Sequence, residues 1–151
     1  WFLINVFPIL EQAIPDIKLN VVGDNSAPSL ATIGKDNINF TGRIDSIEEI
    51  YNISRVFIAP TRFAAGIPHK IHEAAAKGLP SVTTPLLAQQ LGWKDSKELL
   101  VGDTPEGYAA QCIKLYQDEK LWQDVRDAGL AAIIEDCSQE TFRKNLAGLF
   151  S

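Results

Sequence analysis

The feature that most constrains this 151-residue chain is a series of short apolar runs separated by longer segments with helical spacing. Five runs have the length of strands. Val56–Ala59 and Leu99–Val101 are apolar throughout rather than alternately apolar and polar, which is typical of strands covered on both faces. They lie at Ile17–Val22, Ile38–Phe40, Val56–Ala59, Pro80–Thr83 and Leu99–Val101. Strands that alternate with helices at these intervals predict a parallel sheet between two helical layers.

Helix signals occupy the segments between these runs. Apolar residues recur at helical spacing from Phe2 to Ile14, and Ser46 with Glu49 matches a capping box for a helix ending near Ile53. The other predicted helices are Pro68–Lys77, Pro85–Leu91, Glu106–Gln117, Lys120–Glu135 and Gln139–Leu149. The sequence therefore predicts one α/β domain with helices on both faces of its sheet and a helical C-terminal tail. Its ligand should lie at the carboxyl ends of the strands.

Charge and composition exclude several classes of protein. With 14 basic and 19 acidic residues the net charge is −5, which is the wrong sign for a nucleic-acid-binding or polybasic membrane module. The apolar stretch at the start ends at Glu11, too soon to span a membrane, and no secretory signal is present. Cys112 and Cys137 lack metal-ligand spacing and are predicted to be free thiols. Because the chain contains no methionine, we expect it to be part of a longer protein.

Several common site motifs are absent. The sequence has no dinucleotide-binding glycine fingerprint after Gly23, no phosphate-binding GxxxxGK[ST] loop and no G-x-S-x-G nucleophile motif. His69, His72 and Glu73 have a spacing that could place three metal ligands on one helical face. Their order differs from that of the known zinc-protease helices, and no further ligand is spaced to complete a site. The sequence therefore predicts no metal.

The most informative segment runs from Pro60 to Thr84. In it Gly66-Ile67-Pro68 leads into a helix, whose first N–H groups and positive dipole end can hold an anion. Lys70 adds a positive charge in the first turn, where it opposes the dipole and therefore indicates a role toward a ligand. Glu73, one turn later, can accept hydrogen bonds from two vicinal hydroxyls. An anion cradle beside such a carboxylate suits a nucleotide diphosphate sugar.

The same segment resembles the donor-binding motif of group 1 (family 4) retaining glycosyltransferases, whose two Rossmann-like domains form the GT-B fold. The usual motif has two glutamates separated by seven residues and then Ala-x-Ala-x-Gly-x-Pro-Val-Val. Here Glu73 matches the second glutamate, and the residues that follow it are Ala74, Ala76, Gly78, Pro80 and Val82. The resemblance extends upstream to the segments 20–23, 37–42 and 51–60. It implies that residues 1–151 are the C-terminal, donor-binding domain of a GT-B enzyme.

This resemblance implies a role for each matched residue. Glu73 would hold the ribose hydroxyls, and Lys70 matches the lysine of a subgroup with the pattern Gly-x-Pro-x-Lys-x-x-Glu. Three further residues would face the diphosphate or the donor sugar through their backbone: Gly66, Ile67 and His69. Arg43 and Ile44 would border the base, and Gly23 would leave room for the diphosphate. Arg62 is a further candidate for the diphosphate because it lies in the loop before the helix.

The implied enzyme is a hexosyltransferase that moves a sugar from a nucleotide diphosphate sugar to an acceptor hydroxyl with retention and without a cofactor. Its partners would be the nucleotide sugar and a glycan or lipid-linked acceptor, and its location would be cytoplasmic, with peripheral attachment to the inner membrane face. The family's first strand and acceptor domain have no counterpart in the sequence. We therefore expect the 151-residue chain alone to transfer no sugar.

One departure from the motif leaves two alternatives open. Ala65 stands where the first glutamate of the pair is expected, so a carboxylate that normally touches the donor sugar is missing. A catalytically weak nucleotide-binding or scaffolding domain of the same fold is the main alternative. A nucleotide-sugar 2-epimerase shares the GT-B fold but would need acidic and histidine-bearing catalytic loops that the sequence does not show.

Overall fold

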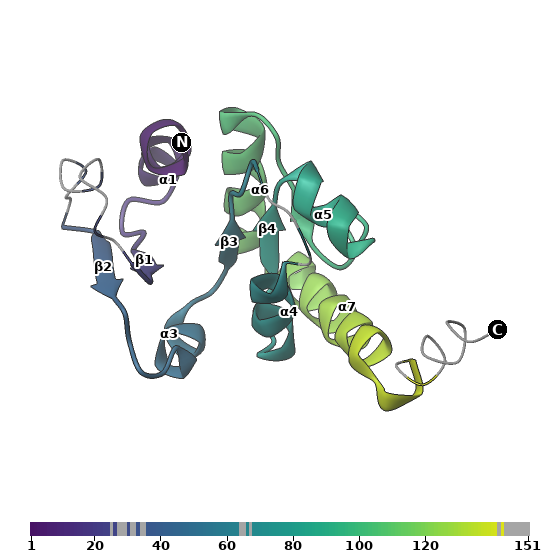
Figure 1. The fold of residues 1–151 in the computed structure, drawn as a ribbon. Coiled ribbons are helices and arrows are strands. Elements are labelled where there is room, and N and C mark those ends of the chain that lie inside the picture. Colours follow the sequence, from purple (N-terminus) through teal and green to yellow (C-terminus); the bar gives the residue numbers. More distant parts are fainter. Residues whose placement is uncertain are drawn as a thin grey trace.

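The computed structural model describes residues 1–24, 26, 30, 33, 36–63, 66, 68–141 and 143 (Figure 1). The first helical segment begins with a π-helical turn, η1. In chain order the elements are η1 (Phe2–Val6), α1 (Phe7–Ala13), β1 (Leu19–Val22), β2 (Ile38–Gly42), α3 (Glu48–Ile53), β3 (Phe57–Ala59), α4 (His69–Ala76), β4 (Ser81–Thr83), α5 (Pro85–Leu91), β5 (Leu100–Val101), α6 (Pro105–Gln117) and α7 (Glu119–Cys137). All five predicted strands are present, and the predicted alternation of strands and helices is confirmed.

Every strand pair is parallel, as predicted, and the strands form two sheets. β1 pairs with β2, with Leu19 opposite Ile38. The second sheet has the order β3-β4-β5, with Ile58 opposite Val82 and Thr83 opposite Val101. Among the described residues, no strand joins β1 to β3, so the single sheet expected from the sequence is divided in two.

The second sheet is buried on both faces by helices. Successive side chains of a strand point in opposite directions, so neighbouring residues face different cores. Ile58 and Val82 face a core that contains η1, α1 and α6, whereas Ala59 faces a core built by α4, α5 and residues near α7. Helix α6 contacts β4 and β5, while α4 contacts β3, β4 and α7. The predicted helical layers on both sides of the sheet are therefore confirmed, and this burial fits the apolar residues of β3 and β5.

Local capping fixes the start of the two tail helices. Thr104 Oγ1 accepts a hydrogen bond from the Gly107 N–H (3.0 Å) at the start of α6, and Asp118 Oδ1 accepts one from the Leu121 N–H (3.0 Å) at the start of α7. Each bond satisfies one of the backbone donors that a helix start leaves unpaired. The third predicted tail helix, Gln139–Leu149, lies largely outside the described residues.

The capping box predicted for α3 is wrong in detail. Ser46 Oγ accepts from the Glu48 N–H (3.3 Å), and the helix begins at Glu48 with no side-chain hydrogen bond at its N-cap, Ile47. The serine lies one residue too early for the reciprocal pattern with Glu49. Glu48 pairs instead with Lys77 Nζ at 2.8 Å, which connects α3 to the end of α4.

Candidate functional site

The carboxyl ends of the strands form the edge at which the sequence predicts a ligand. β1 and β2 end beside Gly23 and Gly42, and β3 is followed by Pro60 and Thr61. A cavity of about 870 Å³ lies between β1 and β3 and reaches this edge. Its lining there includes Val22, Pro60, Thr61, Lys70 and Glu73. Two of the predicted binding residues therefore line one cavity.

Helix α4 presents Lys70 and Glu73 because its opposite face is apolar and buried. The buried residues are Ile71, Ala74 and Ala75. Lys70 and Glu73 are exposed and lie three positions apart, so they are neighbours on one face of the helix. The helix ends where Gly78 adopts a φ of 72°, a conformation that a side chain would strain. One helix thus brings a cation and a carboxylate to the same part of the cavity.

The carboxylate of Glu73 has a protein partner, which the sequence analysis did not assign. Tyr51 on α3 is buried, and its hydroxyl lies close enough to the Glu73 carboxylate for the two groups to interact. Burial, together with the negative charge and hydrogen bond of Glu73, raises the pKa of Tyr51 to about 12. A carboxylate has two oxygens and about four acceptor positions, so the contact with Tyr51 leaves capacity for ligand hydroxyls.

Lys70 provides the positive charge at this edge of the cavity. It lies in the first turn of α4, which contains no acidic residue. A lysine there adds to the positive end of the helix dipole instead of offsetting it. The pair Lys70 and Glu73 can therefore meet a ligand that carries both an anionic group and neutral hydroxyls.

The other predicted residues of the loop before α4 surround the helix start. Gly66 has a φ of 94°, and the His69 ring lies 6.5 Å from the His72 ring, centroid to centroid. The Arg62 guanidinium stacks over the Trp1 ring at 5.3 Å, so this arginine contacts the first residue of the chain. Two residues singled out in the sequence, Ala65 and Ile67, lie outside the described residues.

The predicted base-binding and diphosphate-binding residues lie at the ends of the first sheet. Gly23 has a φ of 117°, and a Cβ built on it would meet none of the described atoms within 4 Å. Arg43 and Ile44 follow β2 and are exposed. These three residues are not part of the cavity lining that holds Lys70 and Glu73. The structure thus brings Lys70 and Glu73 together and leaves this second group outside the cavity lining, at the ends of β1 and β2.

The histidines of α4 belong to a structural cluster. The Trp93 Nε1–H donates to Asp136 Oδ2 (2.8 Å), and His72 Nε2 lies 3.7 Å from the same oxygen. Trp93 itself is buried. In the part of the chain that the structure describes, no group of three His, Cys, Asp or Glu side chains is arranged to hold a metal. Cys112 and Cys137 are free, as predicted.

The fold and the cavity define a Rossmann-like α/β domain whose candidate site lies at the carboxyl edge of parallel strands. A family model described as "Glycosyl transferases group 1" matches residues 1–118, and the chain belongs to this family. A comparison with curated protein sequences finds no match. The group 1 assignment made from the sequence is therefore confirmed at the level of the family.

Solved structures of glycosyltransferases share the fold. HepE of Anabaena, crystallised with UDP and glucose, superposes with a TM-score of 0.79 and 14% identity, covering 96% of this chain and 43% of its own. A glycosyltransferase from Rickettsia africae superposes with a TM-score of 0.77 and 18% identity, covering 97% of this chain and 43% of its own. The C-terminal domain of LpcC, a group 1 family protein of Francisella tularensis, superposes with a TM-score of 0.71 and 18% identity. The match covers 87% of this chain and 75% of the LpcC domain. The predicted fold, that of a GT-B C-terminal domain, is confirmed.

The chain spans 43% of the length of the first two of these structures. None of the helices in the described residues combines the length and the apolar character needed to cross a membrane.

Proposed function

We propose that this chain is the donor-binding domain of a retaining glycosyltransferase that moves a hexose from a nucleotide diphosphate sugar to an acceptor hydroxyl. The observation that carries the proposal is the placement of Lys70 and Glu73 on one face of α4 at the carboxyl edge of the sheet. A nucleoside diphosphate offers phosphates to Lys70 and ribose hydroxyls to Glu73. Support comes from HepE of Anabaena, which was crystallised with UDP and with UDP-glucose.

Each residue then has a proposed contact. Glu73 accepts from the ribose hydroxyls, and Lys70 meets the phosphates. The backbone before and at the start of α4 faces the diphosphate and the sugar, through Gly66, Ile67 and His69. Arg62 reaches the same diphosphate from its loop. Gly23 gives the diphosphate room at the end of β1, and Arg43 with Ile44 borders the base.

The chemical contribution of this domain is to hold the donor and to stabilise its leaving group. When the sugar–phosphate bond breaks, negative charge develops on the departing diphosphate, and in this proposal Lys70 and the N–H groups at the start of α4 stabilise that charge. Fixing the donor against the acceptor removes the entropy cost of bringing the two together. We propose that no metal or other cofactor takes part.

The acceptor is proposed to be a glycan or a lipid-linked sugar, held by polypeptide outside these 151 residues. The Francisella relative is itself a C-terminal domain, which supports the same position for this chain in a two-domain enzyme. The proposed location is the cytoplasm, at the inner face of the membrane. Without an acceptor domain, the 151-residue chain should bind donor without transferring sugar.

Ala65 favours a second candidate, a domain that binds nucleotide sugars with little or no catalysis. The two candidates agree on donor binding and differ in turnover. A thermal-shift panel of UDP-, GDP- and ADP-glucose on the full-length protein identifies the donor, since a ligand at a hundred times its Kd stabilises a protein by about 2.7 kcal/mol. An assay that follows transfer of radiolabelled sugar from this donor to a cell extract containing acceptors then separates the two candidates. No stabilisation by any nucleotide sugar would contradict both candidates.

A further inference from the structure

Helix α3 meets helix α4 at two points, which lie one turn apart on each helix. Glu48 of α3 pairs with Lys77 of α4, with Lys77 Nζ 2.8 Å from Glu48 Oε1. Three positions later on α3, the Tyr51 hydroxyl lies close enough to Glu73 to interact with it, and Glu73 is four positions before Lys77. Residues three or four apart are neighbours on one face of a helix, so both contacts join the same two faces. One of these contacts involves the residue that the proposed function assigns to the ribose.

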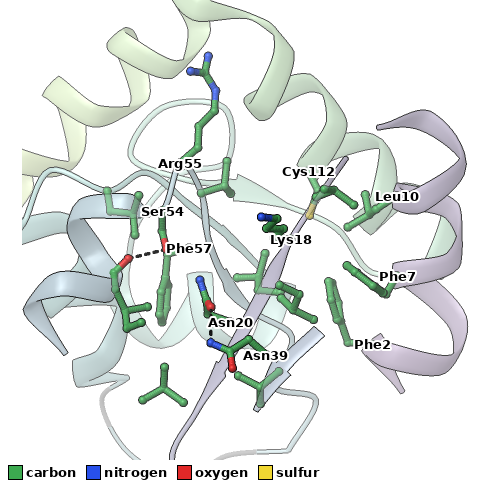
Figure 2. Close-up of a pocket in the computed structure, with 18 of the residues that line it drawn as sticks. Phe2, Phe7, Leu10, Lys18, Asn20, Asn39, Ser54, Arg55, Phe57 and Cys112 are labelled. Atoms are coloured by element: carbon green, nitrogen blue, oxygen red, sulfur yellow. Dashed lines mark hydrogen bonds between the residues drawn. The ribbon is translucent and has the colours of Figure 1, made fainter. Parts of the chain in front are cut away.

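The ring of Tyr51 is fixed by its surroundings. Its exposed fraction is 6%, and it belongs to a small core with Ala74 and Leu79. The Phe57 ring of β3 lies 6.3 Å from it, centroid to centroid, at an interplanar angle of 50°. Figure 2 shows Phe57 among the side chains that line the cavity. A tyrosine ring packed in this way holds its hydroxyl in one place.

The side chain of Glu73 has the opposite character. It is exposed, whereas Ala74 and Ala75, which follow it on α4, are buried. An exposed glutamate turns freely about its side-chain bonds, and a ligand that binds the carboxylate must restrict them at a cost in entropy. A fixed hydroxyl beside the carboxylate restricts it before the ligand arrives. Such pre-organisation strengthens binding, because less freedom is lost in the binding step.

The hydroxyl of Tyr51 is suited to act on Glu73 as a donor. Burial, together with the negative charge of Glu73, raises the pKa of Tyr51 to about 12, so the hydroxyl keeps its proton at neutral pH. An ionised carboxylate only accepts hydrogen bonds, and it does so at both of its oxygens. A carboxylate held by Tyr51 at one acceptor position therefore keeps the others for the two hydroxyls of a ribose.

We propose that Tyr51 is a positioning residue of the donor site, whose hydroxyl holds the Glu73 carboxylate in the orientation that accepts the ribose hydroxyls. This inference rests on the proposed function, which assigns Glu73 to the ribose. It adds to the site a residue of α3 that does not itself touch the nucleotide. A positioning role differs from a purely structural one, because its effect on binding depends on Glu73 and on the ribose hydroxyls.

Calorimetric titration of the full-length protein tests this role. UDP, GDP and ADP are compared first, and the nucleotide that binds most tightly is then used alongside its 2′,3′-dideoxy analogue, which lacks both ribose hydroxyls. Tyr51→Phe removes one oxygen and keeps the ring, so the packing against Phe57 and Leu79 is retained. The variant should raise the Kd of the ribonucleotide about fivefold, the usual effect of one hydrogen bond. The Kd of the dideoxy analogue should stay at its wild-type value.

Two further variants serve as controls. Glu73→Ala should raise the Kd of the ribonucleotide, and adding Tyr51→Phe to it should cause no further change. Tyr116→Phe removes the hydroxyl of another tyrosine that lines the cavity, and its ring lies 5.5 Å from the Arg55 Cζ, before the amino end of β3. Tyr116→Phe should leave both Kd values unchanged. The melting temperature of each variant shows that it is folded.

The outcomes separate this inference from the function on which it rests. If a folded Tyr51→Phe variant binds the ribonucleotide as tightly as the wild type while Glu73→Ala weakens binding, the positioning role is overturned and the proposed function stands. Equal losses for the ribonucleotide and its dideoxy analogue also overturn the role, because Tyr51 would then support the site as a whole. If Glu73→Ala leaves the Kd unchanged, the proposed function fails and this inference fails with it.

Discussion

The contact between Tyr51 and Glu73 can be measured as a coupling energy. Tyr51 is buried, and its hydroxyl interacts with the carboxylate of Glu73, which is itself exposed. Tyr51→Phe removes the donor, and the freed carboxylate can bind water, so the loss should be about 1 kcal/mol, within the usual range for one hydrogen bond. Glu73→Ala leaves the buried hydroxyl without this acceptor, which typically costs about 1–3 kcal/mol.

A double-mutant cycle on the full-length protein separates this contact from other effects. Urea unfolding of the wild type, Tyr51→Phe, Glu73→Ala and the double variant gives the four free energies of unfolding. We expect Tyr51→Phe to cost about 1 kcal/mol in the wild type and close to nothing when Glu73 is already alanine. Equal losses in the two backgrounds would refute the reasoning, because Tyr51 would then not act through Glu73.

The alkaline pH dependence gives a second readout of the same pair. Burial raises the pKa of Tyr51 to about 12, with Glu73 adding to the effect, whereas an unfolded tyrosine titrates near 10. Between these values the unfolded state has lost the proton and the folded state keeps it, so stability falls as the pH rises from about 10 to about 12. Tyr51→Phe should make this fall shallower. An unchanged slope in the variant would show that Tyr51 ionises as easily in the fold as outside it.

Two further predictions concern stability. A Cβ on Gly102 would lie 2.7 Å from the Tyr108 backbone nitrogen, so Gly102→Ala should cost roughly 1–3 kcal/mol in urea unfolding. Gly129→Ala, whose Cβ would keep ordinary contacts, should be neutral or stabilising, and equal effects of the two would contradict the packing argument. Burial lowers the pKa of His72, so the stability that its neutral form contributes is present above pH 6.5 and is lost as the pH falls below it. His72→Gln should therefore make the free energy of unfolding fall less steeply between pH 7 and pH 5. His69→Gln, on the exposed side of α4, serves as the control. Equal pH dependence of the unfolding free energy in His72→Gln and the wild type would count against this.

The order and type of the elements could be predicted because local signals agree with the tertiary environment. The segment Val56–Ala59 is apolar throughout, and the strand β3 that it contains is indeed covered on both faces. The helix predicted at Glu106–Gln117 is present as α6, which begins one residue earlier and is capped by Thr104. The observed ends of the strands differ from the predicted ones by one or two residues. The first strand, for example, was predicted from Ile17 and begins at Leu19, because strand ends depend on pairing partners that the sequence does not show.

The features that could not be predicted depend on distances between separate elements. Tyr51 belongs to a segment that carried the family resemblance, yet nothing in its spacing indicates that its hydroxyl reaches Glu73 on another helix. The division into two sheets is equally invisible, because the apolar pattern of β1 is the same whether its second edge is paired or open. Conversely, the proximity of Lys70 and Glu73 could be predicted, since three residues on a helix is a local distance.

The central claim is that Glu73 binds the ribose of a nucleotide diphosphate sugar, and calorimetric titration of the full-length protein with UDP-glucose tests it most directly. Glu73→Ala should raise the Kd at least tenfold, since each tenfold is about 1.4 kcal/mol and hydrogen bonds to a charged group are worth about 1.5–3 kcal/mol. Glu49→Ala, which removes an exposed carboxylate from the first turn of α3, should leave the Kd unchanged. The melting temperature of each variant, recorded alongside, shows that it is folded. A folded Glu73→Ala variant that binds the nucleotide sugar as tightly as the wild type would contradict the account.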